Sequence, residues 1–262
     1  MTARSRSSLI PTKRSKRAPE NAQGSDVWTV RRAVAELIRH GDRRNVDGMA
    51  RFGIRAKKIY GVSKPQLDEI ARRIGKNHDL GRKLWGTGIH DARLLGMLIC
   101  EPSRVTAMQM ERWVRDFDNW DICDGTCCHL FVDAAPAWTK AFTWATRHGE
   151  FEKRAGFALA AFLAIHDKEA SDPFFRKFLK RIEREAGDDR NFVRKAVNWA
   201  LRNIGKRNSH LNRQAITTAE RIRRKGTPTG RWIASDALRE LRSEAVQRRL
   251  IQKKVKERCQ RS

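Results

Sequence analysis

Apolar residues recur at the spacing of one α-helical face through almost the whole stretch from Val27 to Gln247. Sustained apolar–polar alternation, which is typical of a half-buried strand, is missing, and no strand–helix–strand succession is found. The clearest helical faces are Val30, Val34, Leu37 and Ile38; Leu67, Ile70, Ala71 and Ile74; Leu94, Leu95, Leu98 and Ile99; and Val193, Ala196, Val197, Ala200, Leu201 and Ile204. The pattern predicts an all-α fold of roughly ten or more helices.

Capping residues separate these faces by short connections. Ser63 and Ser171 each stand shortly before a proline, Pro65 and Pro173, as at the first turn of a helix, and an Asp-Asp-Arg-Asn cluster at 188–191 precedes another apolar face. Helical segments joined by short turns favour a HEAT-like α-solenoid, in which stacked helical pairs present a concave basic face. A compact helical bundle is the alternative.

The positive charge of the chain narrows the range of partners. Lysine and arginine total 56 against 30 aspartates and glutamates in 262 residues, which gives a formal net charge of +26. Such a surplus opposes compaction by self-repulsion, so a polyanionic partner is expected. Nucleic acid is favoured because neutralising phosphates releases counterions. Charge alone leaves DNA, RNA, an anionic membrane and a merely solvated basic surface open.

The chain is expected to be cytoplasmic and to consist of one domain between two basic tails. No apolar run approaches the roughly 20 residues needed to span a bilayer, and no apolar segment follows the basic N-terminus as in a secretory signal. Five cysteines without the spacing of a disulfide scaffold are expected to be reduced thiols. We predict a disordered basic tail at residues 1–26, one helical-repeat domain at 27–247 and a basic C-terminal tail at 248–262.

The segment from Asp116 to Asp124 holds four acids in nine residues of an otherwise cationic chain. If a helix begins near Asn119, Trp120 and Asp124 lie one turn apart on the same face. Acids in the first helical turn are favoured by the helix dipole. This effect accounts for the earlier acids but less well for Asp124, because it fades after the first turn.

Several further segments occur in an order that is typical of a known family. They are Tyr60-Gly61-Val62-Ser63-Lys64-Pro65, Leu84-Trp85, His90-Asp91-Ala92-Arg93, Asn119-Trp120-Asp121-Ile122-Cys123-Asp124 and Phe192-Val193-Arg194-Lys195-Ala196-Val197-Asn198-Trp199-Ala200-Leu201-Arg202. Together they resemble the AlkD-like DNA alkylation repair glycosylases over roughly Val27 to Arg242. The resemblance implies HEAT-like repeats and a DNA glycosylase activity, and the blocks around Trp120 and Trp199 are its most specific part.

The resemblance also implies particular site residues. The family's pattern is an Asp four positions after a Trp, then an Arg about a helix pair later, then a Trp within a helix. On this pattern the catalytic residue is Asp124, and Trp120, Arg154 and Trp199 bind the DNA or the lesion. Arg147 is a near alternative to Arg154, and no metal or cofactor is implied.

These residue types suit the removal of a charged base. A purine alkylated at N3 or N7 is cationic, so its N-glycosidic bond is weakened, and its departure leaves an oxocarbenium-like sugar that a carboxylate such as Asp124 stabilises. Tryptophan faces attract cations and pack on sugar CH groups, which suits Trp120 and Trp199. Arg154 would hold a backbone phosphate beside the lesion.

Each of these residues also has a purely structural interpretation. The two tryptophans could be core aromatics, Asp124 a salt-bridged acid and Arg154 a solvated cation. The ordered set of four makes that interpretation less favoured for the set than for any one member. The cysteines and histidine within residues 123–129 are expected to provide buried thiols rather than a zinc site, because one helix cannot supply four tetrahedral ligands.

The sequence therefore predicts a monomeric DNA glycosylase that acts on positively charged alkylpurines in duplex DNA. It is expected to be monofunctional, because no lysine is placed near Asp124 for a Schiff-base step, and to be nucleoid-associated if its source is a bacterium. The alternative is a noncatalytic HEAT-repeat protein that binds DNA structures or acidic partners. An RNA-binding repeat protein is less favoured, because no stacking aromatic recurs once per repeat.

Overall fold

The computed structural model describes residues 27–259, and these form fourteen α-helices and two short 3₁₀-helices with no strand among them. The α-helices are α1 (Val30–Arg39), α2 (Arg43–Arg51), α3 (Lys64–Ile74), α4 (His78–Trp85), α5 (His90–Ile99), α6 (Ala107–Arg115), α7 (Trp120–His129), α8 (Ala137–Trp144), α9 (Glu150–His166), α10 (Asp172–Glu185), α11 (Asn191–Gly205), α12 (Ser209–Arg224), α13 (Pro228–Leu241) and α14 (Glu244–Cys259). The 3₁₀-helices are η1 (Pro102–Arg104) and η2 (Phe131–Asp133). The all-α prediction is confirmed.

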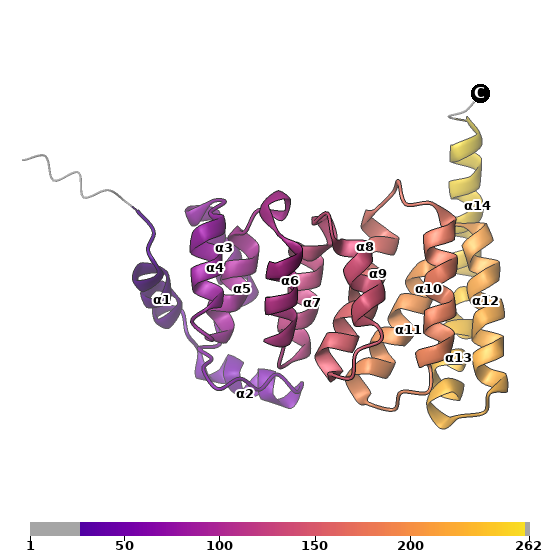
Figure 1. Ribbon diagram of the computed structural model, residues 1–262, viewed down its shortest axis with the longest axis horizontal. Coiled ribbons are helices and arrows are strands. Elements are labelled where there is room, and N and C mark those ends of the chain that lie inside the picture. Colours follow the sequence, from indigo (N-terminus) through magenta and orange to yellow (C-terminus); the bar gives the residue numbers. More distant parts are fainter. Residues whose placement is uncertain (1–26, 260–262) are drawn as a thin grey trace, which may run out of the picture.

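The helices stack side by side in one row of two layers (Figure 1). One layer contains α5, α7, α9, α11 and α13, each packed on the next, with α3 beside α5. The other layer contains α4, α6, α8, α10 and α12, of which α4 packs on α5, α8 on α9 and α12 on α13. This succession of helical pairs confirms the HEAT-like α-solenoid and not the compact bundle.

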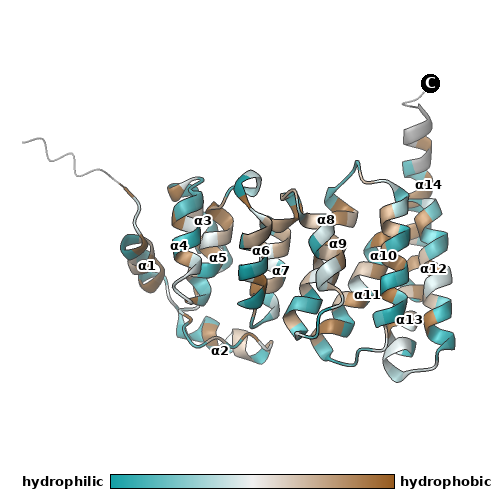
Figure 2. Cartoon of the chain, in the orientation of Figure 1, coloured by the Kyte–Doolittle hydropathy of each residue, from teal (hydrophilic) through white to brown (hydrophobic). Residues whose placement is uncertain are grey.

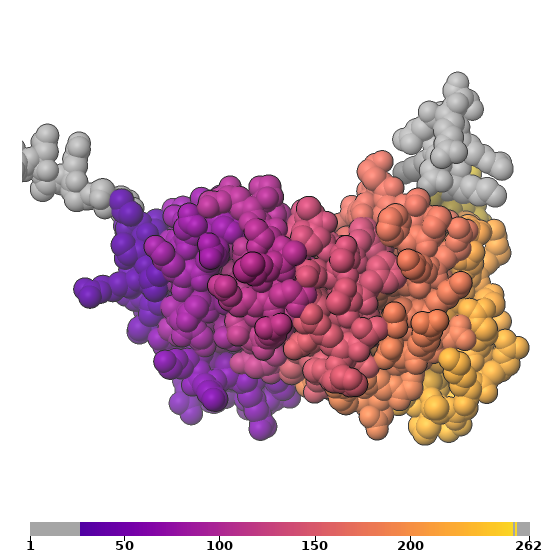
Figure 3. Space-filling view, in the orientation of Figure 1, coloured from indigo at the N-terminus to yellow at the C-terminus, as the bar shows by residue number. Residues whose placement is uncertain are grey.

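One continuous core runs between the layers from Ala33 to Leu241. Apolar residues form the core between the layers, whereas hydrophilic residues, coloured teal, cover much of α4, α10 and α12 (Figure 2). Trp85 and Trp113 stack with their ring centroids 3.9 Å apart, and Trp144 is fully buried. Full burial of a large apolar side chain contributes about 1.5–3 kcal/mol to stability. The packed helices form one unbroken body (Figure 3). No described helix is both long and apolar enough to cross a membrane.

The predicted capping residues do begin helices, although not all in the expected way. Ser63 begins α3 through a capping box with Gln66, whose Oε1 accepts hydrogen bonds from the Ser63 N–H (3.2 Å) and hydroxyl (2.7 Å). Ser171 precedes α10. Before α11 the N-cap is Arg190, which offers no capping side chain. Asp188 instead accepts a hydrogen bond from Arg190 Nε (2.9 Å), so this acid fixes the connection before α11 and does not cap it.

Helix α2 lies crosswise to the row and has no buried residue of its own (Figure 1). The loop before α3 fixes its position: the Asp42 N–H donates to the Tyr60 carbonyl (2.9 Å), and the buried Asp91 carboxylate accepts the N–H groups of Tyr60 (2.7 Å) and Val62 (2.8 Å). Gly61 has φ +76°, and a Cβ there would lie 2.4 Å from the Asp42 carbonyl, so glycine is required. This loop therefore anchors α2 and the turn that follows it.

Of the two predicted tails, the structure describes most of the C-terminal one. The N-terminal tail, residues 1–26, lies outside the described residues. The domain boundary expected at residue 247 falls inside α14, which runs from Glu244 to Cys259. Val246 and Leu250 are buried, so the first turns of α14 pack against the row.

Candidate active site

Helix α7 begins where the sequence predicts. Asn119 is fully buried, and its Oδ1 accepts the backbone N–H groups of Asp121 (3.0 Å) and Ile122 (3.1 Å), so it caps the helix and starts it at Trp120. Trp120 and Asp124 therefore lie one turn apart on the same face of α7.

The acids around the start of α7 have different partners. Asp116 accepts a hydrogen bond from Trp85 Nε1 (2.8 Å), and the Asp121 carboxylate lies 3.1 Å from Nε2 of the buried His90. These contacts give both acids a structural task. Asp124 instead faces α9, where it meets Arg154.

Asp124 and Arg154 form a two-pronged ion pair. Arg154 Nε donates to Asp124 Oδ1 (2.8 Å) and Nη2 to Oδ2 (2.5 Å), while Nη1 donates to the Phe192 carbonyl (2.7 Å). The side chains are 18% and 8% exposed, respectively. Burial raises the pKa of Asp124 above its ordinary value, against the opposing effect of Arg154, and Asp124 in turn raises the pKa of Arg154. Paired hydrogen bonds between a guanidinium and a carboxylate are among the strongest that side chains form, and they fix the relative orientation of the two groups.

The structure separates the two arginines that the sequence left as alternatives. Arg147 Nη1 donates to Glu152 (3.0 Å) and its Nη2 to Glu111, which also accepts from Lys140 Nζ (2.7 Å). Arg154 lines the cavity described below, and Arg147 is not among the residues that line it. Of the two, Arg154 is therefore the arginine placed beside Asp124.

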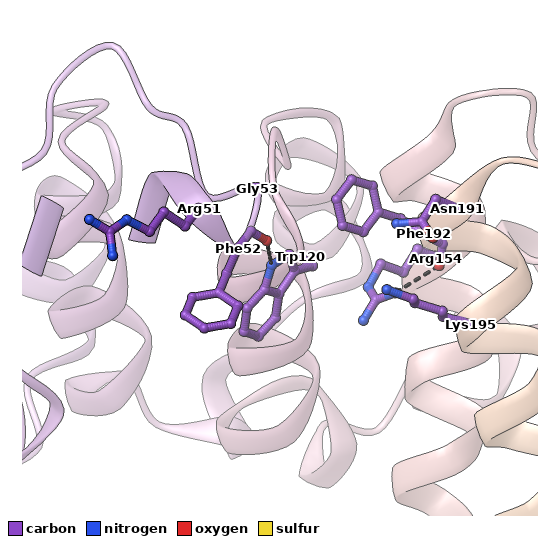
Figure 4. Close-up of a pocket in the computed structure, with 8 residues that line it drawn as sticks. All are labelled: Arg51, Phe52, Gly53, Trp120, Arg154, Asn191, Phe192 and Lys195. Atoms are coloured by element: carbon purple, nitrogen blue, oxygen red, sulfur yellow. Dashed lines mark hydrogen bonds between the residues drawn. The ribbon is translucent and has the colours of Figure 1, made fainter. Parts of the chain in front are cut away.

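The cavity beside this ion pair has a volume of about 480 Å³ and two facing walls (Figure 4). The turn after α2 and Trp120 form one wall, and Arg154 with the first turns of α11 forms the other. Within the first wall, Trp120 Nε1 donates to the Phe52 carbonyl (2.9 Å). The two walls approach each other at Gly53, where a Cβ would lie 3.2 Å from the Phe192 ring. The lining residues are Arg51, Phe52, Gly53, Trp120, Arg154, Asn191, Phe192 and Lys195.

Sequence reasoning missed several of these residues. Phe192 packs on Phe151 with ring centroids 5.3 Å apart, and its ring lies 6.0 Å from the Arg154 guanidinium carbon. Lys195 is exposed on the same helix face, one turn further along. Phe192 and Lys195 belong to the segment from Phe192 to Arg202 that carries the family resemblance, so this segment could have pointed to them. Phe52 carried no such signal, because its place in the site depends on how α2 crosses the row.

Trp199 lies beyond the cavity, which Trp120 and Arg154 line and to which Asp124 is joined by its ion pair with Arg154. It follows Lys195 by one turn of α11, is half-buried, and packs edge-on against Phe162 with ring centroids 4.8 Å apart. The structure thus brings Trp120, Asp124 and Arg154 together and places Trp199 one turn away on the adjoining wall. Its contact with the lesion stays a prediction.

Two of the three cysteines of α7 are buried against α9, whereas Cys128 is only partly buried and departs from the expectation of buried thiols. Cys123 and Cys127 are fully buried, and their thiols donate to carbonyls of α9, Phe151 (3.6 Å) and Ala155 (3.7 Å). Burial raises the pKa of the Cys123 thiol well above its ordinary value. The prediction of buried thiols is confirmed for these two residues. Within residues 27–259 no group of three or more histidines, cysteines or acids is placed to hold a metal ion.

A solved structure shares this fold. It superposes with a TM-score of 0.69 and 18% identity over 82% of this chain and 96% of its own, and it is described as "a new family of proteins related to the HEAT-like repeat DNA glycosylases with affinity for branched DNA structures". At this identity the likeness shows the fold alone.

Matches to known sequences extend the comparison. Uncharacterized proteins of Listeria monocytogenes (Lmo0209) and Listeria innocua (Lin0241) are each 24% identical over 168 residues, which is 63% of this chain and 72% of theirs. The family described as DNA alkylation repair enzyme matches residues 33–241, which include all four predicted site residues. The resemblance found in the sequence is confirmed, and the chain belongs to the DNA alkylation repair enzyme family.

Proposed function

We propose that the protein is a DNA glycosylase that hydrolyses the N-glycosidic bond of N3- or N7-alkylated, positively charged purines in duplex DNA. The observation that supports this most directly is the Asp124–Arg154 ion pair beside a cavity walled by aromatic rings and cations. Membership of the DNA alkylation repair family supports the class of substrate.

Asp124 would act on the developing charge of the sugar. When the cationic base departs, the sugar becomes oxocarbenium-like, and a carboxylate in partly desolvated surroundings stabilises it more strongly than water does. The carboxylate oxygens have about four acceptor sites, and Arg154 occupies two of them. The remaining sites can face the sugar or orient the attacking water.

Arg154 would hold both Asp124 and a phosphate. Its guanidinium has about five N–H donors, and the structure uses three of them for Asp124 and the Phe192 carbonyl. One donor remains on each Nη atom. A backbone phosphate that enters the cavity can accept these donors, which would fix the DNA relative to the catalytic carboxylate.

The reaction is expected to end at an abasic site without strand cleavage. Lys195 nevertheless lines the same cavity as Arg154, although the sequence placed no lysine near Asp124. A lyase step through Lys195 would form a Schiff base that borohydride traps covalently on the DNA. We expect free base without such a crosslink, and a crosslink that Lys195→Arg removes would contradict monofunctional hydrolysis.

The decisive experiment uses duplex DNA that carries 7-methylguanine. Wild-type protein should release free 7-methylguanine, Asp124→Asn should not, and Asp118→Asn should behave as wild type, because Asp118 is a half-exposed acid just before α7. Failure of the wild type to release any N3- or N7-alkylated purine would refute the glycosylase proposal.

The second candidate is a noncatalytic protein that binds DNA structures. The observation in its favour is the shared fold with a protein whose description names affinity for branched DNA. It predicts tighter binding to a four-way junction than to an alkylated duplex of equal length, with no base release. Titration of both DNAs beside the release assay separates the two functions.

A further inference from the structure

The ring of Phe52 has no task in the chemistry proposed above, yet it stands at the mouth of the cavity. Phe52 directly follows α2 and is 74% exposed, the largest exposed fraction among the large apolar side chains described. A single exposed apolar residue is common on protein surfaces. The argument therefore depends on how Phe52 is held and on what surrounds it.

The backbone around Phe52 is fixed on both sides. Its carbonyl accepts the Trp120 Nε1–H (2.9 Å), so the site tryptophan itself anchors the turn. Gly53 has φ +82° and sits against the edge of the Phe192 ring, where a side chain would lie only 3.2 Å away. Ile54 is buried and donates its N–H back to α2 (3.0 Å). The exposed ring thus projects from a rigid turn and not from a loose loop.

Cations outnumber acids along the chain around Phe52, where the preceding acid, Asp47 on α2, pairs with Arg43 (3.4 Å). No acid occurs between Gly48 and Leu67. On the facing wall of the cavity lies Lys195, which is also exposed. The exposed cations on the Phe52 side are Arg51, Arg55, Lys57 and Lys58. An aromatic ring flanked in this way by cations suits a base whose neighbouring phosphates lie on either side.

We propose that Phe52 is a stacking site for a nucleobase, and that it stacks on the base beside the gap left in the helix by the lesion. This inference rests on the proposed function. Aromatic rings stack on any base, because every base has a π-face, and apolar side chains that enter a base step hold it open. The contact would keep the lesion's sugar beside Asp124 while Arg154 and Lys195 hold the backbone.

The test is a binding measurement on DNA that cannot react. Duplexes carry a tetrahydrofuran abasic analogue next to 2-aminopurine, and an intact duplex serves for comparison. Phe52→Ala should bind the gapped duplex about 10- to 100-fold more weakly than wild type and the intact duplex almost equally. Phe52→Trp should retain tight binding and Phe52→Leu should lose most of it, and 2-aminopurine emission should change with wild type and Phe52→Trp only.

Controls separate stacking from a general loss of structure. Met108→Ala removes another side chain that is 72% exposed, on α6, and should bind both duplexes as wild type does. All variants should melt at the wild-type temperature. Equal binding of the gapped duplex by Phe52→Ala, equal binding by Phe52→Leu, or an equal loss on the intact duplex would overturn the stacking site.

The outcome is independent of base release, because the tetrahydrofuran analogue has no base to lose. Phe52-dependent binding of the gapped duplex by a wild-type protein that releases no alkylpurine would refute the proposed function and leave the stacking site standing. Normal release with binding that does not depend on Phe52 would refute the stacking site alone.

Discussion

Glu111 and Asp124 are both paired with arginines, and their surroundings differ. Glu111 on α6 accepts hydrogen bonds from Lys140 Nζ (2.7 Å), Trp144 Nε1 (3.0 Å) and Arg147. Burial raises the pKa of Glu111, but these three donors outweigh it and lower the pKa to about 2. This cluster ties α6 to α8 and the turn after it, so its charges stabilise the fold.

Asp124 on α7 has the opposite balance. Burial raises its pKa, and the single cation Arg154 only partly offsets this effect. The Glu111 carboxylate accepts hydrogen bonds from three residues, whereas Asp124 accepts two from the single residue Arg154, which lines a cavity. The contrast shows that a carboxylate–arginine contact alone does not identify a functional site. Glu111 and Asp124 differ in the number of residues that donate to them and in the open space beside them.

The largest effect is expected from neutralising each acid in turn. Asp124→Asn should lower the single-turnover rate of base release by about 100- to 1,000-fold, or about 3–4 kcal/mol of barrier, because the amide keeps the shape but loses the charge. Glu111→Gln should lower the melting temperature and leave the rate per folded molecule unchanged. Quenched-flow release of 7-methylguanine and thermal melts measure both. Equal rate losses in the two variants would show that the sites do not differ in function.

The two acids should also lose their charge at different pH, because their pKa values are shifted in opposite directions. The raised pKa of Asp124 means that its carboxylate is lost at a higher pH than the ordinary value of 3.8, and base release should fall about tenfold per pH unit below that pKa. Glu111 has a lowered pKa, so its contribution to stability is present above its ordinary value of 4.5 and is lost only as the pH falls toward about 2.

Activity should therefore fail in acid before the fold does. Parallel measurement of release and circular dichroism checks this order, after subtraction of spontaneous depurination. Coincident loss of both signals would contradict it. Asp124→Asn should lack the acid limb of the rate profile.

Most of the fold and half of the site followed from local sequence. Helical faces, proline-marked first turns and the Asn119 cap depend on residues a few positions apart, so periodicity and capping chemistry predict them. The Trp120–Asp124 relation follows from the same rule, since four residues make one helical turn.

The rest of the site depends on contacts between distant segments. Phe52 reaches Trp120 across 68 residues, and Arg154 reaches Asp124 across 30. No local rule reports such pairings, and only the family resemblance pointed to Arg154. The cap cluster before α11 shows the same limit, because Asp188 is occupied by the Arg190 side chain and is not free to cap.

A smaller effect is expected from removing either tryptophan, of which Trp120 lies on one wall of the site and Trp199 on the helix that forms the other. Trp120→Ala and Trp199→Ala should each weaken excision of a cationic lesion by about 5- to 30-fold, or about 1–2 kcal/mol, because an aromatic face attracts positive charge only where that charge is present. Binding to undamaged duplex should change less. Trp120→Ala also removes the hydrogen bond to the Phe52 carbonyl, so Trp120→Phe serves as its matched control.

The smallest effect is expected on the salt dependence of DNA binding, when the arginine paired with Asp124 and the arginine paired with Glu111 are each removed. Affinity for undamaged duplex should fall steeply with salt, with a slope that corresponds to roughly 5–8 phosphates. Since removing Arg154 alone would leave Asp124 buried without a partner, the comparison is made between Asp124→Asn and Asp124→Asn/Arg154→Ala. The double variant, which lacks Arg154, should have a salt slope smaller by about one unit than Asp124→Asn, because the two unused N–H donors of Arg154 can hold one phosphate. Arg147→Ala should leave the slope unchanged, since Glu111 and Glu152 already occupy that guanidinium.

A log–log plot of affinity against salt measures these slopes. Equal slopes for Asp124→Asn and Asp124→Asn/Arg154→Ala would show that Arg154 only positions Asp124 and does not bind the DNA backbone.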